Sequence, residues 1–411
     1  MTNAETTAAG LPRATAETPA PPAGSPTTHR WSPVLAVALA TFTLVSSEMM
    51  PVGLLTPMSH SLGVTDGATG LSLTITGLIA AALSPFAPAL VGPRDRRSVL
   101  VAFMLLLGLA NAVTALAPNF AVLAVGRVLL GAAMGIVWGL VASLGPRLAD
   151  GPRLALAMTL IFSGVSIASV LGVPLGTYLA ALLDWRAAFW ALALLGAASA
   201  AVLAATLPPL PAHRRARLDG LAGALRHRGI ATGAAITAFV VLGHFAGYTY
   251  VRPVLEADAG LSSGTIATCL LVYGLAGVAG NFTLGPMSGR RPKTAVTLAL
   301  SGVTLATALL GSATGGLVTV LLVLVLWGVS YGGVSVSTQT WFRLADPARV
   351  EASAALWAGV FNASIALGSL AGGLVVDRAG NHAVLLTAAA LAGAGLLLTV
   401  LSRPDRPADR A

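Results

Sequence analysis

The chain has 411 residues, of which 56% are hydrophobic and only 9% are charged. A soluble protein of this length carries about 25% charged residues to solvate its surface, so the composition predicts an integral membrane protein. The net charge of +9 comes from basic residues scattered through short loops. Because no basic face or basic tail is present, this pattern argues against nucleic-acid binding.

Reactive and metal-ligating residues are few. The single cysteine, Cys269, excludes an internal disulfide framework and any multi-cysteine metal site. The six histidines show no ligand-like spacing, and no nucleophile–histidine–acid signature or phosphate-binding loop stands out. We therefore expect that the protein is not an enzyme and that it uses neither a metal nor another cofactor.

The chain opens with residues 1–30, which are rich in Ala, Thr and Pro and predict a disordered tail. Apolar runs follow, each long enough for the roughly 20 residues of a membrane span. Together they predict an all-α membrane protein with twelve transmembrane helices. The predicted helices are 31–58, 68–91, 98–117, 120–145, 153–181, 186–207, 229–252, 262–287, 294–313, 316–341, 351–377 and 383–402.

The basic residues fix a predicted orientation. With the N-terminus in the cytoplasm, 20 of the 24 lysines and arginines fall in cytoplasmic segments and Arg127 lies within a span. The three basic residues that fall outside are Arg186, Arg252 and Arg378. This asymmetry is the positive-inside pattern, so both tails, 1–30 and 403–411, are predicted to be cytoplasmic in a bacterial inner-membrane protein.

The longest polar stretch between spans is the basic segment 208–228, which follows the sixth helix. It separates 31–207 from 229–402, two regions of nearly equal length, and so predicts two pseudo-symmetric six-helix bundles. Transporters with such repeats bind substrate between the halves. The linker arginines fit a tether that meets anionic lipid headgroups better than a regulatory site.

Only one of the fifteen acidic residues, Glu48, lies well inside a predicted span. An ionised carboxylate in hydrocarbon costs several kcal/mol, so Glu48 should face a cavity, pair with a base or hold a proton. Counting about 1.5 Å per residue places Arg127 at a matching depth. A Glu48–Arg127 pair, direct or through water, would serve proton coupling or merely lock two helices together.

His244 occupies nearly the same place in the second half as Glu48 does in the first. Histidine titrates near neutral pH, so His244 is a third candidate for proton coupling or a donor to a substrate hydroxyl. A hydrogen bond to a neighbouring backbone carbonyl is the competing interpretation.

Aromatic and polar residues within the spans are candidates for the wall of a substrate cavity. For the aromatic ones, anchoring at the membrane interface is the competing interpretation. The candidates are Trp138, Phe245, Tyr248, Tyr250, Trp327, Tyr331, Trp357 and Asn362.

The fifth predicted helix carries Gly164, Gly172 and Gly176 on one face. Small residues at this spacing let helices approach closely in lipid, which explains the glycines without further assumptions. Pro174 frees one backbone carbonyl and favours a bend, so a moving, gating contact is also predicted.

These segments resemble the major facilitator superfamily over essentially the whole of 31–402. The fourth helix resembles the family motif whose arginine is implicated in proton coupling, and the fifth resembles the motif of the antiporter branches; they read RVLLGAAMG and GVSIASVLGVPLGTYL. Other stretches are similar to the sugar-efflux, arabinose-efflux and chloramphenicol-resistance branch of the twelve-span drug:proton antiporters, such as SSEMMPVGLL and GHFAGYTYVRPVL.

One loop departs from the family pattern. Between the second and third helices, Gly92, Asp95, Arg96 and Arg97 match the family's cytoplasmic loop motif in kind, but their spacing is contracted. The sequence leaves open whether these residues still form the family's charge-relay latch.

The resemblance and the lone membrane carboxylate together predict a monomeric, proton-coupled exporter that works by alternating access and is driven by the proton gradient. The expected substrate is a sugar-like metabolite or a drug such as chloramphenicol. The alternatives are a proton symporter or uncoupled facilitator that imports a metabolite, and a membrane sensor that transports nothing. The sequence does not name the substrate.

Overall fold

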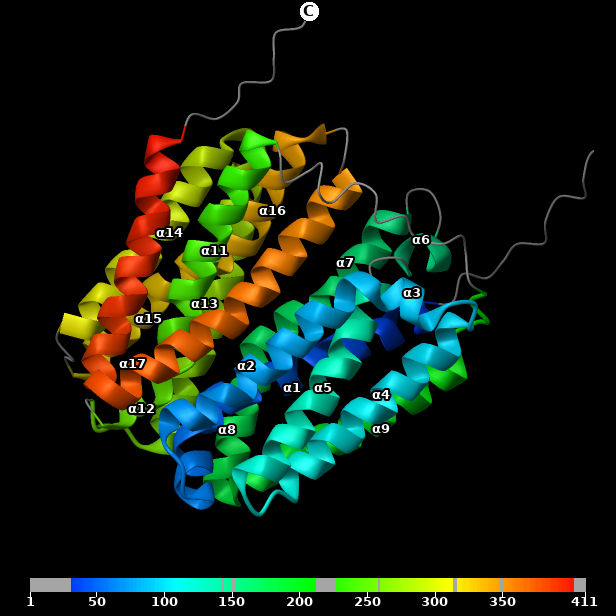
Figure 1. The fold of residues 1–411 in the computed structure, drawn as a ribbon, viewed down its shortest axis with the longest axis horizontal. Helices are drawn as coiled ribbons and strands as arrows, with labels where there is room; N and C mark the ends of the chain where they lie inside the picture. The colour runs from blue at the N-terminus through cyan, green and yellow to red at the C-terminus, as the bar shows by residue number, and fades with distance from the viewer. Residues whose placement is uncertain are drawn as a thin grey trace, which may run out of the picture. The chain divides into compact units, whose positions relative to one another are not determined.

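The structure, a computed structural model, describes residues 31–141, 144–149, 153–211, 227–257, 259–312, 316–347 and 350–402. The predicted tails 1–30 and 403–411, and residues 212–226 of the predicted linker, lie outside the described residues. Every regular element in the described ranges is a helix, which confirms the all-α prediction (Figure 1).

The first half of the chain forms helices at each predicted position. The fifth predicted helix is interrupted by a π-helical turn, η2 (Ala168–Gly172), which ends two residues before Pro174, and a short 3-10 turn, Ser84–Phe86, interrupts the second. The α-helices are α1 (Ser32–Leu62), α2 (Asp66–Leu83), α3 (Ala87–Val91), α4 (Arg96–Ala115), α5 (Phe120–Val141), α6 (Gly145–Leu148), α7 (Arg153–Ile167), α8 (Val173–Leu182) and α9 (Trp185–Thr206).

The second half also follows the predicted order. The seventh predicted helix is divided after Tyr248 and the tenth at Gly333. The helices are α11 (Arg228–Tyr248), α12 (Val251–Ala257), α13 (Ser263–Arg290), α14 (Pro292–Ser312), α15 (Leu317–Gly332), α16 (Val334–Ala345) and α17 (Val350–Leu401).

In the described residues, eleven helices are long and apolar enough to cross a membrane, against twelve predicted. The difference lies in α17. Its apolar part, Ser353–Leu401, has 49 residues and would measure about 74 Å, far more than the roughly 30 Å hydrocarbon core. Gly380 interrupts it with φ 81° and ψ −176°, a backbone conformation that glycine adopts readily. Two spans therefore meet there, as 351–377 and 383–402 predict.

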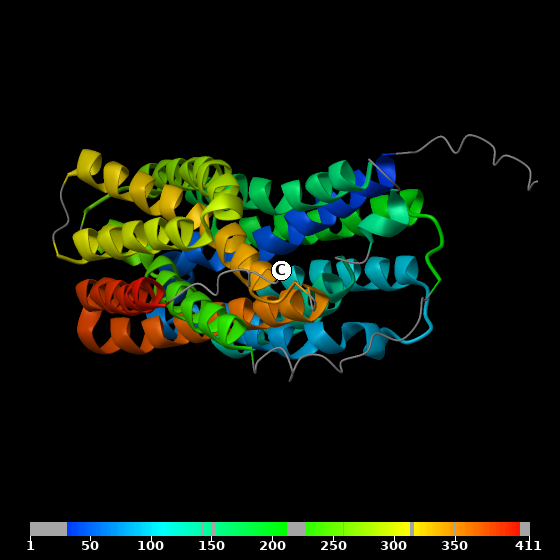
Figure 2. The same ribbon diagram turned by 90° about the horizontal axis from the view of Figure 1, so that it is seen from above.

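Small residues let the helices approach closely. A Cβ on Gly131 of α5 would lie 2.7 Å from the Thr76 carbonyl oxygen of α2, and one on Gly135 would lie 3.0 Å from the Ala80 carbonyl oxygen. The same α2 lies beside α17, far away in the sequence (Figures 1 and 2). Because lipid supplies no hydrophobic drive between helices, such close backbone contacts are what holds them together.

Candidate transport site

Helix α1 contains two prolines in its interior, Pro51 and Pro57, besides Pro33 in its first turn. A proline has no N–H, so the carbonyls four residues earlier, those of Ser47 and Gly53, lose their helical donor. A buried arginine replaces each donor. Arg127 Nη1 donates to the Ser47 carbonyl at 3.2 Å, and Arg252 Nη1 donates to the Gly53 carbonyl. The sequence of α1 thus creates the acceptors that let two cations stay buried.

Arg127 is only 1% exposed and is held within the first half of the chain through its two Nη atoms, while its Nε has no hydrogen-bond partner among the described residues. Its Nη2 donates to Thr114 Oγ1 at 3.2 Å, and its guanidinium lies 4.8 Å from the ring centroid of Phe189. Asn111 donates to the hydroxyl of Ser47 at 3.0 Å. These contacts fix the α1 backbone at the residue before Glu48.

Within the described residues, no direct ion pair joins Glu48 to Arg127. The matching depth predicted from the sequence is consistent with the bond to Ser47, the neighbour of Glu48. Arg127 instead uses one N–H on a backbone carbonyl, because Pro51 has left that carbonyl without a helical donor. Any coupling of these two residues during proton transfer stays a prediction.

Glu48 is 6% exposed, and its Oε1 has no hydrogen-bond partner in the described part of the chain. Its carboxyl interacts electrostatically with Tyr331 of α15, a helix of the second half. The Tyr331 hydroxyl also lacks a partner among the described residues. Buried polar groups are normally hydrogen-bonded. Two such groups, one on α1 and one on α15, that are near enough to interact electrostatically therefore mark a candidate binding position for a proton or a hydrogen-bonding ligand.

A set of aromatic rings surrounds this position on the side of the second half. We call the set the aromatic cluster. The rings of Tyr331 and His244 stack with centroids 3.3 Å apart, and the stack continues to Tyr248 at 4.9 Å. Tyr248 in turn stacks on Tyr273 at 4.7 Å. The members of the aromatic cluster are His244, Phe245, Tyr248, Tyr273, Trp327 and Tyr331.

His244 is 1% exposed, and its hydrogen-bond partner is the indole of Trp327. The indole Nε1 donates to His244 Nδ1 at 3.0 Å. Because an indole N–H can only donate, Nδ1 must accept, and the imidazole is neutral while this bond lasts. The sequence suggests a backbone carbonyl as the alternative partner, and the structure places a side chain there instead.

Four of the eight predicted cavity residues, Phe245, Tyr248, Trp327 and Tyr331, belong to the aromatic cluster. The other four lie elsewhere. Tyr250 is fully buried and donates to the Ser369 carbonyl at 2.8 Å. The remaining three residues are half-buried. Trp138 stacks on Phe162, and Asn362 donates to the Ala358 carbonyl. Trp357 donates to Thr338 Oγ1, and its ring packs against that of Phe361.

The glycine face of the fifth predicted helix lies against α1. A Cβ on Gly164 would collide with the Ala38 carbonyl oxygen, and one on Gly172 would lie 2.6 Å from Ser46 Oγ. Gly176 faces Met50. These α1 residues lie on either side of Glu48, so a movement of this face would move the carboxylate.

The loop motif after α3 joins the start of α4 to the end of α9. Gly92 has φ 60°, a left-handed conformation. Asp95 caps α4 by accepting from the Arg97 N–H at 3.0 Å, and it also accepts from the Leu210 N–H at 2.7 Å. Arg96 donates to the Gly92 carbonyl at 3.1 Å, and Arg97 donates to the Ala204 carbonyl. Whether the motif also acts as a latch stays open.

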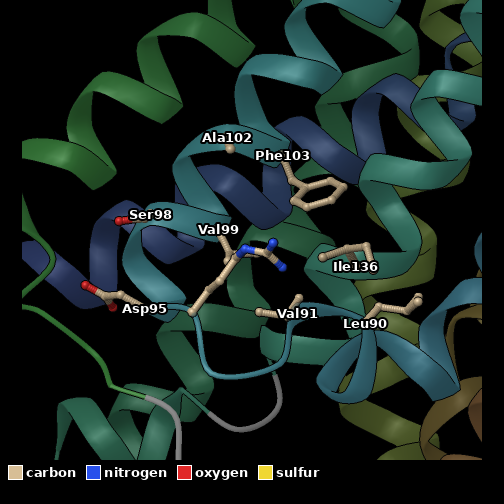
Figure 3. Close-up of a pocket in the computed structure, with 9 residues that line it drawn as sticks. Leu90, Val91, Asp95, Ser98, Val99, Ala102, Phe103 and Ile136 are labelled. Atoms are coloured by element: carbon tan, nitrogen blue, oxygen red, sulfur yellow. The ribbon is translucent and has the colours of Figure 1, made fainter.

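A cavity of about 510 Å³ lies beside this loop (Figure 3). Its lining is apolar except at Arg94, Asp95 and Ser98. Ser98 precedes Asn111 by thirteen residues on α4, or about 20 Å along the helix axis. Since Asn111 marks the level of Ser47, this cavity is separate from the Glu48 position. It is lined by Leu90, Val91, Arg94, Asp95, Ser98, Val99, Ala102, Phe103 and Ile136.

Comparison with known proteins identifies the family. Residues 37–354 match the model of the Major Facilitator Superfamily. The chain belongs to this superfamily and is a multi-pass membrane transporter.

Two relatives align over almost their full length. The transcription regulatory protein OpdE of Pseudomonas aeruginosa is 34% identical over 386 residues, which cover 92% of this chain and 95% of OpdE. The purine ribonucleoside efflux pump NepI of Salmonella typhimurium is 32% identical over 375 residues, which cover 90% of this chain and 92% of NepI.

Solved structures of low sequence identity share the fold. The nucleoside transporter NupG superimposes with a TM-score of 0.74 at 14% identity, covering 90% of this chain and 98% of NupG. A bacterial homolog of the human lysosomal transporter Spinster, in an inward-facing and occupied conformation, superimposes with a TM-score of 0.75 at 15% identity, covering 92% of this chain and 97% of the homolog.

Proposed function

We propose that this protein exports a small molecule in exchange for protons, and that the molecule carries a planar ring together with sugar hydroxyls. A purine ribonucleoside has this chemistry and is the substrate that the name of the relative NepI states. The observation that carries the proposal is that two buried polar atoms, Glu48 Oε1 and the hydroxyl of Tyr331 in the aromatic cluster, both lack a hydrogen-bond partner among the described residues. Ring stacking suits the base, and a carboxylate suits a ribose hydroxyl.

In the proposed cycle, the proton and the substrate compete for Glu48. The ionised carboxylate accepts hydrogen bonds from the substrate when the site faces the cytoplasm, and protonation removes much of that acceptor capacity when the site faces outside. Each proton that moves down 100 mV supplies about 2.3 kcal/mol, enough for roughly fiftyfold accumulation at one charge per cycle. No other cofactor is required.

The proposed architecture places this site between two six-helix bundles, 31–207 and 229–402, that rock around it as a monomer. The arginine distribution supports both termini in the cytoplasm of a bacterial inner membrane. Gly164, Gly172, Pro174 and Gly176 then act as the sliding face on α1.

The test uses vesicles that contain the purified protein and an imposed proton gradient. Inosine, adenosine, arabinose, chloramphenicol and a lipophilic cation are added separately, and dissipation of the gradient is followed by fluorescence. We expect the purine ribonucleosides to release the gradient and Glu48→Gln to stop the release while leaving counterflow exchange.

The matched control is Asp184→Asn. Asp184 caps α9 by accepting from the Trp185 N–H at 2.7 Å, and asparagine caps helices equally well, so this variant loses an acid outside the site without losing the cap. Full uphill efflux by Glu48→Gln would refute the proton role. Movement of protons in the same direction as the substrate would indicate a symporter, and equilibration of substrate without proton movement would indicate a facilitator.

A second candidate function rests on OpdE, whose name states transcription regulation. A sensor of this fold would bind the ligand without carrying it across the membrane. Ligand binding detected by calorimetry, with neither counterflow nor gradient release for any compound, would favour the sensor.

A further inference from the structure

The hydrogen bonds that join 31–207 to 229–402 gather at one end of the molecule. Among the described residues, every such bond connects α1, α2 or the α2 N-cap with α12 or α17, within about 15 Å along the helices of the turn that follows α1. Under the orientation proposed above, this is the outer end. The bonded pairs are Gly53 with Arg252, Thr65 and Gly67 with Asp377, Gly70 with Ser369, and Thr74 with Ala366.

Arg252 is the only cation in these pairs and is 4% exposed. Glu256 holds it from the same half, accepting from Nε at 2.9 Å and lying 2.7 Å from Nη2. Nη2 also donates to Ser263 Oγ at 3.0 Å. With these two partners fixing the guanidinium, Nη1 is aimed across the junction at the Gly53 carbonyl of α1.

The Gly53 carbonyl can receive this bond because Pro57 supplies no helical donor. The Thr177 hydroxyl of α8 lies 3.2 Å from this carbonyl and shares its single proton between it and the Val173 carbonyl at 2.9 Å, so it can turn fully to Gly53 when Arg252 leaves. Each side of the contact therefore has a partner in its own half: Gly53 has Thr177, and Arg252 has Glu256 and Ser263. Breaking the bond between the halves strands neither a buried charge nor a buried carbonyl, so the contact can open and close reversibly.

We propose that Arg252 is a positioning residue of the transport cycle. Its bond to the Gly53 carbonyl closes the outer end, and it fixes the outer part of α1 on the second half. Glu48, five residues before Gly53 on the same helix, is thereby held in place relative to the second half. The inference rests on the alternating-access function proposed above.

Asp377 offers a natural comparison. Its carboxylate accepts from Thr65 Oγ1 at 2.8 Å and from the Gly67 N–H at 3.0 Å, so it joins α17 to the first turn of α2. An anion at a helix N-terminus is favourable. The contact closes the same end without touching α1, so its loss should ease opening but leave Glu48 in place.

The experiment measures opening of the outer end directly. The single cysteine, Cys269, is replaced by serine, and Ser369→Cys serves as the reporter because Ser369 is fully buried at the junction. The parent and every variant carry both changes, so the altered bond to Gly70 is common to all of them. The labelling rate by a membrane-impermeant maleimide is measured in nanodiscs without substrate or gradient. The pH profile of inosine counterflow is measured in parallel.

We expect Arg252→Ala to raise the labelling rate about tenfold or more and to shift the pH profile, and Arg252→Lys to restore most of both. Asp377→Asn should raise the labelling rate without moving the pH profile. Pro57→Ala returns a backbone N–H that competes with Arg252 for the Gly53 carbonyl, so it should raise the labelling rate severalfold. This variant serves as the test if Arg252→Ala does not fold.

Unchanged labelling in both Arg252→Ala and Pro57→Ala would overturn the closing role. Equal shifts of the pH profile in Arg252→Ala and Asp377→Asn, or no shift in either, would overturn the positioning role. Because labelling is measured without substrate or gradient, the test of the closing role does not depend on whether the protein exports nucleosides; a parent protein without inosine counterflow would contradict the proposed function and leave the labelling result standing.

Discussion

Two regions at corresponding places in the two halves handle buried polar groups in different ways. In the first half, Arg127 is held by a proline-freed carbonyl, a hydroxyl and a ring face, and Glu48 stays without a partner in the described residues. In the second half, His244 sits inside a stack of rings and accepts from an indole. The first region is built to hold charge and the second to offer planar surfaces, which suits a division between proton and substrate.

Of the substitutions that test this difference between the two regions, replacement of Arg127 should have the largest effect on stability and transport. Arg127→Ala leaves the Ser47 carbonyl without a donor and opens a cavity, so we expect a loss of about 3 kcal/mol in stability together with loss of transport. Thermal unfolding in detergent measures the loss of stability. Arg147→Ala is the matched control, because Arg147 also donates to a carbonyl but at an exposed position, where substitutions cost less than about 0.5 kcal/mol. Equal losses in both variants would contradict this account.

Tyr331 links the two regions, so its ring and its hydroxyl can be tested separately. Tyr331→Leu removes the stack on His244, and we expect nucleoside affinity to fall about tenfold, within the range of one ring-stacking contact. Tyr331→Phe keeps the ring and removes only the hydroxyl, which has no hydrogen-bond partner among the described residues. It should therefore retain more affinity than the leucine variant in a binding titration. The reverse order would place the substrate away from the rings.

The sliding face is tested at Gly172. A Cβ there would lie 2.6 Å from Ser46 Oγ, so Gly172→Ala should slow counterflow and cost about 1–2 kcal/mol in stability through overpacking. Gly289→Ala is the control, because no atom lies within 4 Å of a Cβ at this helical position. Its stability should stay the same or rise slightly. Unaltered counterflow by Gly172→Ala would remove the sliding role.

The smallest expected effect concerns the bond that keeps His244 neutral. Trp327→Phe retains a ring but deletes the N–H that donates to Nδ1, which costs about 1 kcal/mol. The freed nitrogen can then take up a proton, so transport by this variant should fall more steeply than that of the parent as the medium is acidified. Parallel pH profiles for variant and parent would show that the indole bond does not govern the imidazole.

Much of the fold could be predicted because the bilayer imposes a simple rule. A span needs about 20 apolar residues, so hydropathy places the helices, and the break at Gly380 fits the predicted boundary between 377 and 383. The cost of a charge in hydrocarbon also singles out Glu48 and Arg127 by their positions within apolar runs. Pro51 carries a further signal in the sequence, since a proline in a span frees the carbonyl four residues earlier and so points to a buried donor such as Arg127.

The sequence by itself determined the membrane class, the order of the helices and the burial of Glu48 and Arg127. Only the tertiary structure decided which groups meet: Arg252, predicted in an outside segment, with Gly53, Trp327 with His244, and Tyr273 within the aromatic cluster. The physical reason is that hydropathy fixes where a helix enters the membrane but neither its rotation nor its offset. In lipid these depend on close packing at small residues and on polar contacts between distant segments.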